Sequence, residues 1–587
     1  MLSMVAFAAL ITGTMPSSPP PQARQKVSME FYVVQGPDAQ KRYSFAKNGK
    51  PFWSWGVDCV TTGAAWESYD TGNRAYAAFH HFSNCQAWAE DTAAKLRAWG
   101  FNSLGGWSDF DLFKRYTPDS RLPYFEVLHL GSYDNAPWND MFDPTFKEAI
   151  ESAAKSLLPK FVDDPMLVGY FTDNELGWWG DSLFKSYFAM PSSAPGKVRL
   201  VRMLRSHYDD DFGRLRRDWE TDAAGFDELA KARDITLRPG GEGAQAVNEW
   251  LRVLGERYYS VVYDAIRRYD AHHLILGDRY IQYYNIEIAK SSAPYIDVAS
   301  TNLGADWTDG AISHFFLDTL HKATKRPVII TEFYMCATEN RSGNKNSSDG
   351  FPVVATQAER AAAFGRYVRH VASLPYVVGA HWFQFTDEPE KGRGDGEDYN
   401  MGLVDIFGKP YQGMIRASQS IDFEGIRRAA SNPGAPAKVS VPKAPAEPMA
   451  GLKAWPRDAG FLPPDSPFPT ADLYVAADGD YLYLGLYSME YMDESLYAGG
   501  KVPESERSRW VIQLGDAAPI EIRFGGKDRP PIPSNASVGL HEIPGLRNTL
   551  IARIPRPAGT EVVLHSRFET HSRGEFVSWR MPLELEK

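Results

Sequence analysis

The chain has 587 residues, of which 43% are hydrophobic and 23% charged, so we expect a globular protein with more than one domain. Its net charge of −11 argues against nucleic acid or an anionic membrane surface as the main partner. Its three cysteines, Cys59, Cys85 and Cys336, are too few for a disulfide framework. The spacings typical of zinc sites and nucleotide loops are missing, so no metal and no cofactor is expected.

Residues 1–25 differ from the rest of the chain. The apolar run "MLSMVAFAALITGTM" is too short to span a bilayer and is followed by a Pro- and Ser-rich stretch. This pattern predicts a secretory signal peptide, although a basic start is missing and a simple apolar tail is the alternative. We therefore expect a secreted or periplasmic protein that is not an integral membrane protein.

Between about 50 and 410, short apolar segments alternate with helical ones. The segment 89–100 is helical and ends at Gly100, and 143–161 is an amphipathic helix that Asp143 caps and Pro144 begins. Polar or aromatic residues end most of the apolar segments, which favours a (β/α)₈ TIM barrel over a doubly wound open sheet. The eight predicted strands are 51–58, 101–107, 123–130, 166–173, 274–280, 296–303, 327–334 and 377–385.

A change of pattern marks a second domain. Residues 427–454 are rich in Pro and Ala, as expected of a linker. Beyond them, stretches such as "YLYLGLYSMEY" alternate with period two, which predicts an all-β sandwich over 455–587. The remaining range, 26–426, is the predicted barrel domain.

Two glutamates end strands of the predicted barrel. Glu175 follows the fourth strand in "DNELGWW", and Glu332 ends the seventh in "PVIITEFY". The active site of a (β/α)₈ barrel lies at the carboxyl ends of its strands, and two facing carboxylates are what glycoside hydrolysis needs. The alternatives are a helix-capping role for Glu175 and a structural ion pair for Glu332.

The chain resembles the clan-A retaining (β/α)₈ glycoside hydrolases in its Asn-Glu pair after strand four and its Glu after strand seven. "DNELGWW" and "FTDEPEKGRGDGEDYNMGLVDIFGKPY" (385–411) are most similar to the β-agarase (family 50) and β-galactosidase (family 42) branches. The resemblance implies that Glu175 is the acid/base, Glu332 the nucleophile and Asn174 a ligand of the sugar 2-hydroxyl. The arginine that the clan often carries after strand two is missing, and we suggest that Arg279 on strand five replaces it. The C-terminal domain resembles family-9 carbohydrate-binding modules, although a structural cap on the barrel is nearly as good an interpretation.

Further residues at or near strand ends are candidate substrate contacts, with packing as the alternative for each. Trp382 and at most one of Trp178 and Trp179 are expected to stack on sugar rings. We expect Asp173 to support the loop after strand four rather than to touch substrate. The candidate substrate-binding set is Asn174, Trp382, Asn302, Tyr280, Tyr334, His381 and Trp178.

The resemblance implies a retaining β-glycoside hydrolase that acts on galactose-containing polysaccharide, of the agarose or porphyran type, or on its oligosaccharides. Two alternatives remain: a β-galactosidase or other exo-glycosidase on small oligosaccharides, and a non-catalytic carbohydrate-binding protein on a decayed barrel. The expected partner in each case is a saccharide, and the sequence leaves the oligomeric state open.

Overall fold

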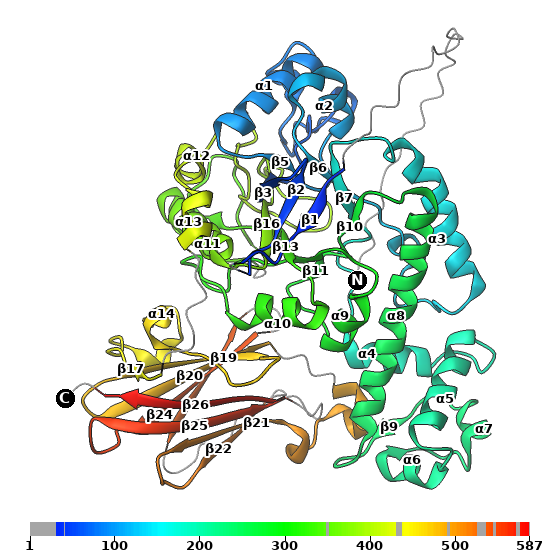
Figure 1. The fold of residues 1–587 in the computed structure, drawn as a ribbon, viewed down its shortest axis with the longest axis vertical. Coiled ribbons are helices and arrows are strands. Elements are labelled where there is room, and N and C mark those ends of the chain that lie inside the picture. Colours follow the sequence, from blue (N-terminus) through cyan, green and yellow to red (C-terminus); the bar gives the residue numbers. More distant parts are fainter. Residues whose placement is uncertain are drawn as a thin grey trace.

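The computed structural model describes residues 31–39, 41–347, 351–429, 437–489, 494–524, 536–543, 547–570 and 576–585. The predicted signal peptide at 1–25 lies outside these residues. A helix-covered parallel sheet forms the upper part of the molecule in Figure 1, and a β-sandwich lies below it. None of the described helices combines the length and the apolar character that crossing a membrane requires.

Nine short strands form one sheet in the order β10-β7-β6-β5-β4-β16-β13-β12-β11, and all neighbouring pairs are parallel. The two edge strands, β10 and β11, belong to one segment, 274–281, which therefore pairs with both ends of the sheet. The sheet is accordingly barrel-like, and each of the eight predicted ranges contains one of its strands. The strands are β4 (Ser54–Val57), β5 (Ser103–Leu104), β6 (Tyr124–Val127), β7 (Leu167–Phe171), β10 (Leu274–Ile275), β11 (Tyr280–Ile281), β12 (Ala299–Asn302), β13 (Val328–Phe333) and β16 (Val377–Trp382).

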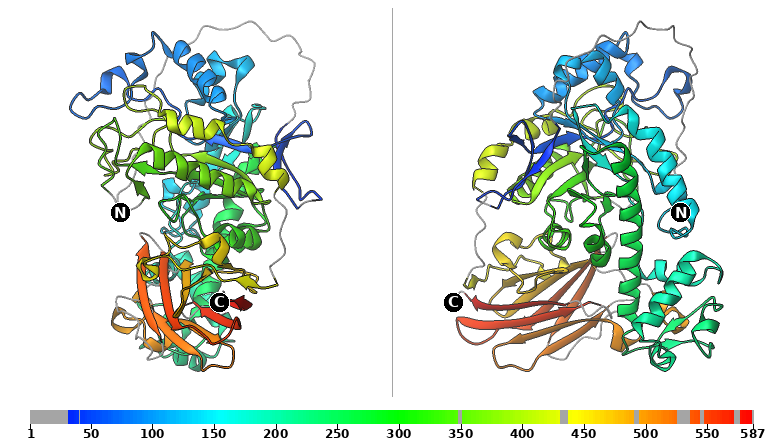
Figure 2. Two further views of the ribbon diagram at one scale, coloured as in Figure 1. Left: turned by 90° about the vertical axis from the view of Figure 1, so that its left-hand side faces the viewer. Right: turned by 45° about the vertical axis from the view of Figure 1, so that its right-hand side comes forward.

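Helices cover the outside of this sheet (Figures 1 and 2). In α3 (Pro144–Leu157), Asp143 accepts a hydrogen bond from the Thr145 amide at 2.9 Å, so the predicted cap is confirmed. A capping box of Thr356 and Glu359 begins α11 (Gln357–Ser373). The other helices on this layer are α1 (Cys85–Ala98), α2 (Phe110–Tyr116), α8 (Gly243–Tyr269), α9 (Ile286–Ser292), α10 (Phe315–Thr324), α12 (Gln412–Gln419) and α13 (Phe423–Ala429).

A small antiparallel sheet near the N-terminus packs against the amino ends of the barrel strands. It consists of β1 (Val33–Gln35), β2 (Ser44–Lys47) and β3 (Lys50–Phe52). Phe45 of β2 is fully buried and belongs to the same apolar cluster as Phe125 and Val168 of the barrel. This sheet therefore covers the end of the barrel opposite the carboxyl ends of the strands.

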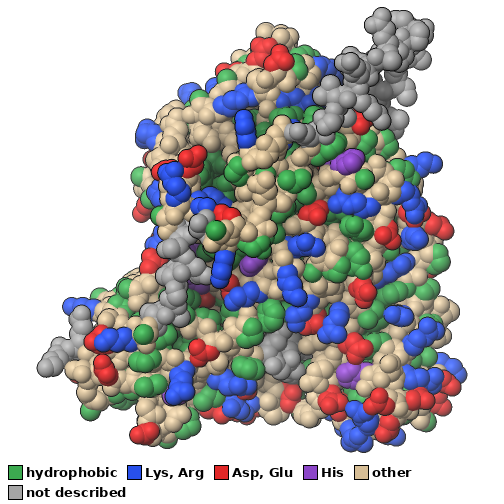
Figure 3. All heavy atoms as spheres, viewed as in Figure 1, with side chains coloured by type: hydrophobic (Ala, Val, Ile, Leu, Met, Phe, Trp, Pro, Cys, Tyr) green, Lys and Arg blue, Asp and Glu red, His purple; other side chains and the backbone are tan. Residues whose placement is uncertain are grey.

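A helical insertion separates β7 from α8. It contains α4 (Gly180–Phe188), α5 (Pro195–His207), α6 (Phe212–Asp218), α7 (Phe226–Leu229) and the strand pair β8 (Trp219–Glu220) and β9 (Thr236–Leu237). Leu237 forms a β-bridge with Tyr497 of the C-terminal region, and the Gly240 amide donates to Glu506. The insertion is therefore joined to the sandwich as well as to the barrel. On the face in Figure 3, acidic and basic side chains are interspersed.

The C-terminal region forms two five-stranded sheets. One has the order β17-β26-β25-β21-β22 and the other β18-β19-β20-β24-β23. Leu482, Leu484 and Leu486 of β20 face the core between the sheets, whereas Tyr483 and Tyr487 belong to the cluster continuous with the barrel. The alternating residues of β20 therefore face two different buried clusters, one between the two sheets and one continuous with the barrel. The strands are β17 (Val439–Ser440), β18 (Phe461–Leu462), β19 (Ala471–Ala477), β20 (Tyr481–Met489), β21 (Ser508–Leu514), β22 (Ile520–Phe524), β23 (Ser537–Ile543), β24 (Arg547–Pro555), β25 (Glu561–Glu569) and β26 (Phe576–Glu584).

The sandwich is attached to the barrel by buried polar contacts. Asp472 of β19 accepts hydrogen bonds from the backbone amides of His314 and Phe315, at 2.7 and 3.1 Å, and so caps α10. Within the predicted linker 427–454, residues 430–436 lie outside the described residues. The strand β17, which also lies in that range, pairs with β26 and is part of the sandwich.

Candidate active site

Glu175 and Glu332 meet at the carboxyl ends of the barrel strands. The Nδ2 atom of Asn302 lies 2.7 Å from Glu175 Oε1 and 3.0 Å from Glu332 Oε1. The two oxygens are therefore at most 5.7 Å apart, the sum of those distances. Glu332 is part of β13, whereas Glu175 follows β7 in a left-handed conformation with φ 54°. Strained backbone of this kind is concentrated at functional sites.

Asn302 holds the two glutamates in a fixed relation. It ends β12 and is fully buried, and its Oδ1 accepts a hydrogen bond from Thr331 Oγ1 at 2.7 Å. That contact fixes the amide so that Nδ2 faces both carboxylates. Its Nδ2 contacts Asn174 and both glutamates, and its contact with substrate stays a prediction.

Arg279 supplies the cation next to Glu332, as suggested from the sequence. Its Nη2 atom lies 3.1 Å from Glu332 Oε1 and 3.0 Å from Asp58 Oδ2. The guanidinium is fully buried and lies 4.3 Å from the ring centroid of Trp107. Arg279 therefore links Asp58, which directly follows β4, to Glu332 of β13.

Burial raises the pKa of Glu332 well above its usual value; Arg279 opposes this shift and the charge of Glu175 adds to it. Burial also raises the pKa of Glu175, opposed by the hydrogen bond from Asn302. Two carboxylates this close do not both ionise readily. The charge of Arg279 lowers the pKa of each, so it favours the ionised form of both glutamates.

Asn174 is oriented by the same network. Its Oδ1 accepts from Arg279 Nη1 and from Asn302 Nδ2, both at 3.1 Å. The side chain is half-buried, and its contact with a sugar hydroxyl stays a prediction. Asp173, in contrast, is fully buried and accepts from the amides of Gly131 and Ser132, which confirms its predicted structural role.

Four candidate substrate contacts are buried and bonded to protein partners, and their contact with substrate stays a prediction. Trp382 is 0% exposed and donates its indole N–H to the Met401 carbonyl. His381 is 0% exposed inside the barrel, where its Nε2 bonds to Ser54 Oγ. The other two, Tyr280 and Trp178, are 4% and 3% exposed and bond to Tyr259 and Asp278 respectively.

Tyr334 lies beside the glutamate pair. Its hydroxyl accepts a hydrogen bond from Gln282 Nε2 at 2.8 Å. Burial raises its pKa well above the usual value, and the nearby charges of Glu332 and Glu175 add to that shift. Its contact with substrate stays a prediction.

Several residues of the site were not identified from the sequence. Asp58, Trp107 and Gln282 are not among the residues predicted for the site. Asp58 directly follows an apolar strand, and this position at a strand end is the sequence signal that could have identified it. Its pairing with Arg279 joins positions 221 residues apart in the chain.

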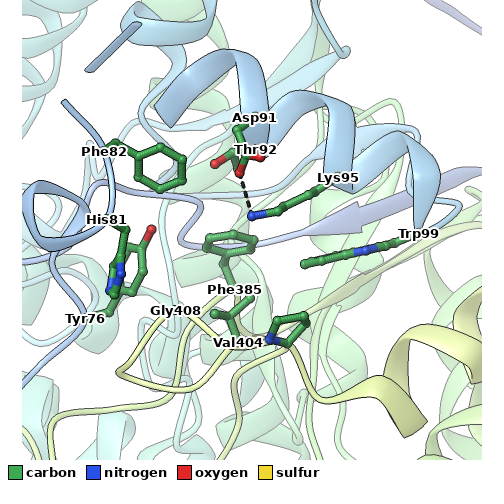
Figure 4. Close-up of a pocket in the computed structure, with 11 residues that line it drawn as sticks. Tyr76, His81, Phe82, Asp91, Thr92, Lys95, Trp99, Phe385, Val404 and Gly408 are labelled. Atoms are coloured by element: carbon green, nitrogen blue, oxygen red, sulfur yellow. Dashed lines mark ion pairs between the residues drawn. The ribbon is translucent and has the colours of Figure 1, made fainter. Parts of the chain in front are cut away.

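A separate cavity of about 240 Å³ lies outside the barrel, between α1 and the segment after β16 (Figure 4). The rings of Tyr76, Trp99 and Phe385 line it, together with an ion pair between Lys95 and Asp91 at 2.6 Å. None of the predicted site residues lines this cavity, so it is distinct from the glutamate pair.

No family model matches the chain. β-Agarase B of Vibrio sp. (strain JT0107) is 29% identical over 360 residues, which cover 57% of this chain and 36% of the relative. β-Agarase A of the same strain is 28% identical over 368 residues, with the same two coverages. The match thus spans about a third of the length of these curated relatives.

Solved structures share the fold. The agarase AgWH50C has a TM-score of 0.57 at 23% identity, covering 69% of this chain and 66% of that one. An exo-β-agarase has a TM-score of 0.56 at 22% identity, covering 68% and 66%. The chain is therefore similar in sequence to β-agarases and similar in fold to solved agarases.

Proposed function

We propose that this chain is a retaining β-glycoside hydrolase of the family-50 β-agarase type, acting on agarose or related β-galactan and its oligosaccharides. The observation that carries the proposal is the contact of one Asn302 amide with both Glu175 and Glu332. The resulting bound of 5.7 Å on the oxygen separation lies below the carboxyl spacing of about 6.5–9.5 Å that inverting enzymes use. The sequence similarity to two β-agarases supports the substrate class.

In the first step, an oxygen of Glu332 attacks the anomeric carbon of the sugar. The bond from that carbon to the glycosidic oxygen breaks as Glu175 gives its proton to the departing oxygen. The Arg279 ion pair keeps Glu332 ionised for attack, and Asn302 fixes the positions of the two carboxyl groups relative to each other. Asn174 directs its Nδ2 to the sugar, which fits a hydrogen bond to the 2-hydroxyl.

In the second step, the covalent sugar ester has removed the charge from Glu332. The pKa of Glu175 then falls because its charged neighbour has gone, and it accepts a proton from water. The water oxygen bonds to the anomeric carbon and the ester to Glu332 breaks. Two displacements at one carbon give a product with the starting anomeric configuration.

The proposal extends to the domain division. We assign 26–426 to a closed (β/α)₈ catalytic domain and 455–587 to the sandwich, with 1–25 as a signal for secretion. Pairing of segment 274–281 with both β7 and β12 supports the closure. The buried contacts of Asp472 with α10 favour a sandwich built onto the barrel over a freely tethered binding module.

The test is turnover of agarose, porphyran and plant galactan with analysis of product sizes over time. Glu332→Ala should abolish turnover, and azide should partly restore it on an activated β-galactoside with inverted product. Glu148→Ala, a change on the exposed face of α3, is the matched control and should leave turnover unchanged. Equal turnover by Glu332→Ala and the control would refute the assignment, and saccharide binding without product would indicate a binding protein.

A further inference from the structure

An exposed tryptophan lies on the segment between β4 and α1, residues 58–84. The ring of Trp66 is 74% exposed, whereas most large aromatic side chains of proteins are largely buried. Its contact with Phe79 is T-shaped, with centroids 5.0 Å apart and planes at 66°. This single ring contact leaves most of the indole in solvent.

Further aromatic rings surround Phe79. Its ring contacts Tyr69, with centroids 5.6 Å apart and planes at 83°, and His80, with centroids 4.3 Å apart. Tyr69 and Phe79 are half-buried, and His80 is exposed. Trp66, Tyr69, Phe79 and His80 therefore form one contiguous aromatic surface, which we call the loop platform. Contiguous exposed surface of this kind is a mark of binding sites.

The loop platform is fixed to the rest of the barrel domain. The amide of Ala64 donates to the Tyr76 carbonyl at 2.9 Å and joins the two halves of the segment. Asn73 donates to the Gly392 carbonyl at 2.9 Å and accepts from the Lys391 amide at 2.7 Å, both on the segment after β16. A surface held in this way loses little conformational freedom when a ligand binds.

The cavity between α1 and the segment after β16 continues the loop platform. The rings of His80 and His81 have centroids 6.4 Å apart, and His81 is stacked on Tyr76 at 5.8 Å. Tyr76 and His81 both line the cavity of about 240 Å³ (Figure 4). Its volume corresponds to about eight water molecules at about 30 Å³ each, so a hydroxylated part of a ligand has room beside the platform.

The charges around this surface favour a neutral ligand. Arg74 is paired with Glu390 at 2.8 Å, and Lys95 is paired with Asp91 at 2.6 Å. The exposed carboxylate of Glu67 directly follows the tryptophan in the chain. An anionic group would meet cations that are already neutralised and a further negative charge. A neutral pyranose, with an apolar face for the rings and hydroxyls for the polar groups, matches the surface better.

The loop platform lies at the same end of the barrel as the glutamate pair. Its segment begins at Asp58, directly after β4, and Asp58 is bonded to Arg279 beside Glu332. The glutamates contact Asn302 and Arg279, whereas the rings of the platform contact one another, so the two surfaces are separate. A polysaccharide chain that reaches both is held at two points, which raises its effective concentration at the glutamates.

We propose that the loop platform is a second saccharide site, outside the catalytic cleft, which holds a neutral β-galactan chain with a pyranose ring stacked on Trp66. The choice of β-galactan rests on the proposed function, whereas binding at the platform does not require turnover. Phe79 and Tyr69 hold the indole in place. The site acts on polymer and not on short oligosaccharides, because only a chain occupies the platform and the cleft together.

The test compares a polymer with a short substrate. Retention on insoluble agarose is measured in the Glu332→Ala background, so that the matrix is not consumed. Trp66→Ala should weaken retention by about two- to tenfold, as expected for loss of one aromatic contact. In the otherwise unchanged protein it should lower kcat/KM on agarose similarly and change kcat/KM on an agarose-derived tetrasaccharide by less than about twofold. Trp66→Tyr keeps a stacking ring and should lose less on agarose.

Two controls separate the platform from other exposed rings and from charge. Phe576→Ala, at a ring of β26 that is 43% exposed, should alter none of these values. A sulfated galactan in solution should displace the protein from agarose less effectively than an unsulfated one, because of Glu67. Equal displacement by the two galactans would overturn the neutral ligand.

The remaining outcomes distinguish the platform from the hydrolase proposal. Retention unchanged by Trp66→Ala, or an equal loss of kcat/KM on agarose and the tetrasaccharide, overturns the platform and leaves the hydrolase in place. A wild-type dimer that Trp66→Ala dissociates in gel filtration also overturns it, because the surface is then a contact between copies. Retention that depends on Trp66, with no turnover of any saccharide by the wild-type protein, instead supports the platform and refutes the hydrolase proposal.

Discussion

Replacing Arg279 by Gln should move the pH dependence of the reaction and not only its rate. The guanidinium is the cation 3.1 Å from Glu332 and 3.0 Å from Asp58, and it is fully buried. An opposite charge at this range lowers a carboxyl pKa by about 1–3 units, so its removal should raise the pKa of Glu332 by that amount. The acid limb of kcat/KM, which reports the ionised nucleophile, should therefore move about 1–3 units to higher pH.

The same change leaves two buried carboxylates without their cation. Breaking a buried ion pair from one side costs about 3–5 kcal/mol, so the free energy of unfolding should fall by that order. The assay is a pH series of initial rates on an oligosaccharide, with urea unfolding in parallel. Arg360→Gln is the matched control, because Arg360 is also fully buried but donates to the carbonyls of Met335 and Gly402. An unmoved acid limb in Arg279→Gln, or an equal shift in Arg360→Gln, would contradict the role given to Arg279.

Two further predictions concern packing and the sandwich. Trp382→Ala should lower the free energy of unfolding by about 3–5 kcal/mol and leave the KM of the folded fraction unchanged, since the ring is buried. A raised KM at unchanged stability would instead indicate that Trp382 contacts the sugar. Burial raises the pKa of Asp472 to about 7, above its usual 3.8, so the native protein loses stability as pH rises from about 4 to about 7. In the Asp472→Asn variant this loss should be absent. Between pH 4.5 and 7.5 its free energy of unfolding, measured in urea, should therefore rise by at most about 4 kcal/mol relative to wild type. The lost cap bond lowers the stability of the variant by a constant amount at every pH. A pH-independent difference between the two proteins would contradict this.

The strands and the glutamate pair could be predicted because their signals are local. Apolar runs of barrel strands end in polar residues, and this places Glu175 and Glu332 at the same end of the sheet. Asp143 and Pro144 likewise specify the start of α3 within three residues. Such features depend on neighbours in sequence, which the chain displays directly.

The orientation of individual strand-end side chains could not be predicted in the same way. Strands of a parallel sheet are buried on both faces, so apolar pattern does not separate Trp382, which faces the helix layer, from a ring at the mouth. His381 and Ser54 meet inside the barrel although 327 residues separate them. Which of Trp178 and Trp179 is turned inward depends on Asp278. This buried partner of Trp178 lies on the next barrel segment along the chain.

For Arg279, the residue could be suggested from the sequence but its contacts could not. The absence of an arginine after strand two is visible in "FNSLGGW", and Arg279 was suggested as its replacement. What the sequence does not contain is the geometry that lets one guanidinium reach both Asp58 and Glu332. That geometry follows from barrel-like curvature, which brings the ends of β4, β13 and the 274–281 segment to a common point.

In the proposed mechanism, Glu332 forms a covalent bond to the sugar. A 2-deoxy-2-fluoro glycosyl fluoride of the β-galactan type, which forms the ester but hydrolyses slowly, should label the protein once. Mass spectrometry of the digested protein should then place the label on Glu332, in the peptide that contains "PVIITEFY". A label on Glu175 or on another residue, or turnover without any labelling, would contradict the account.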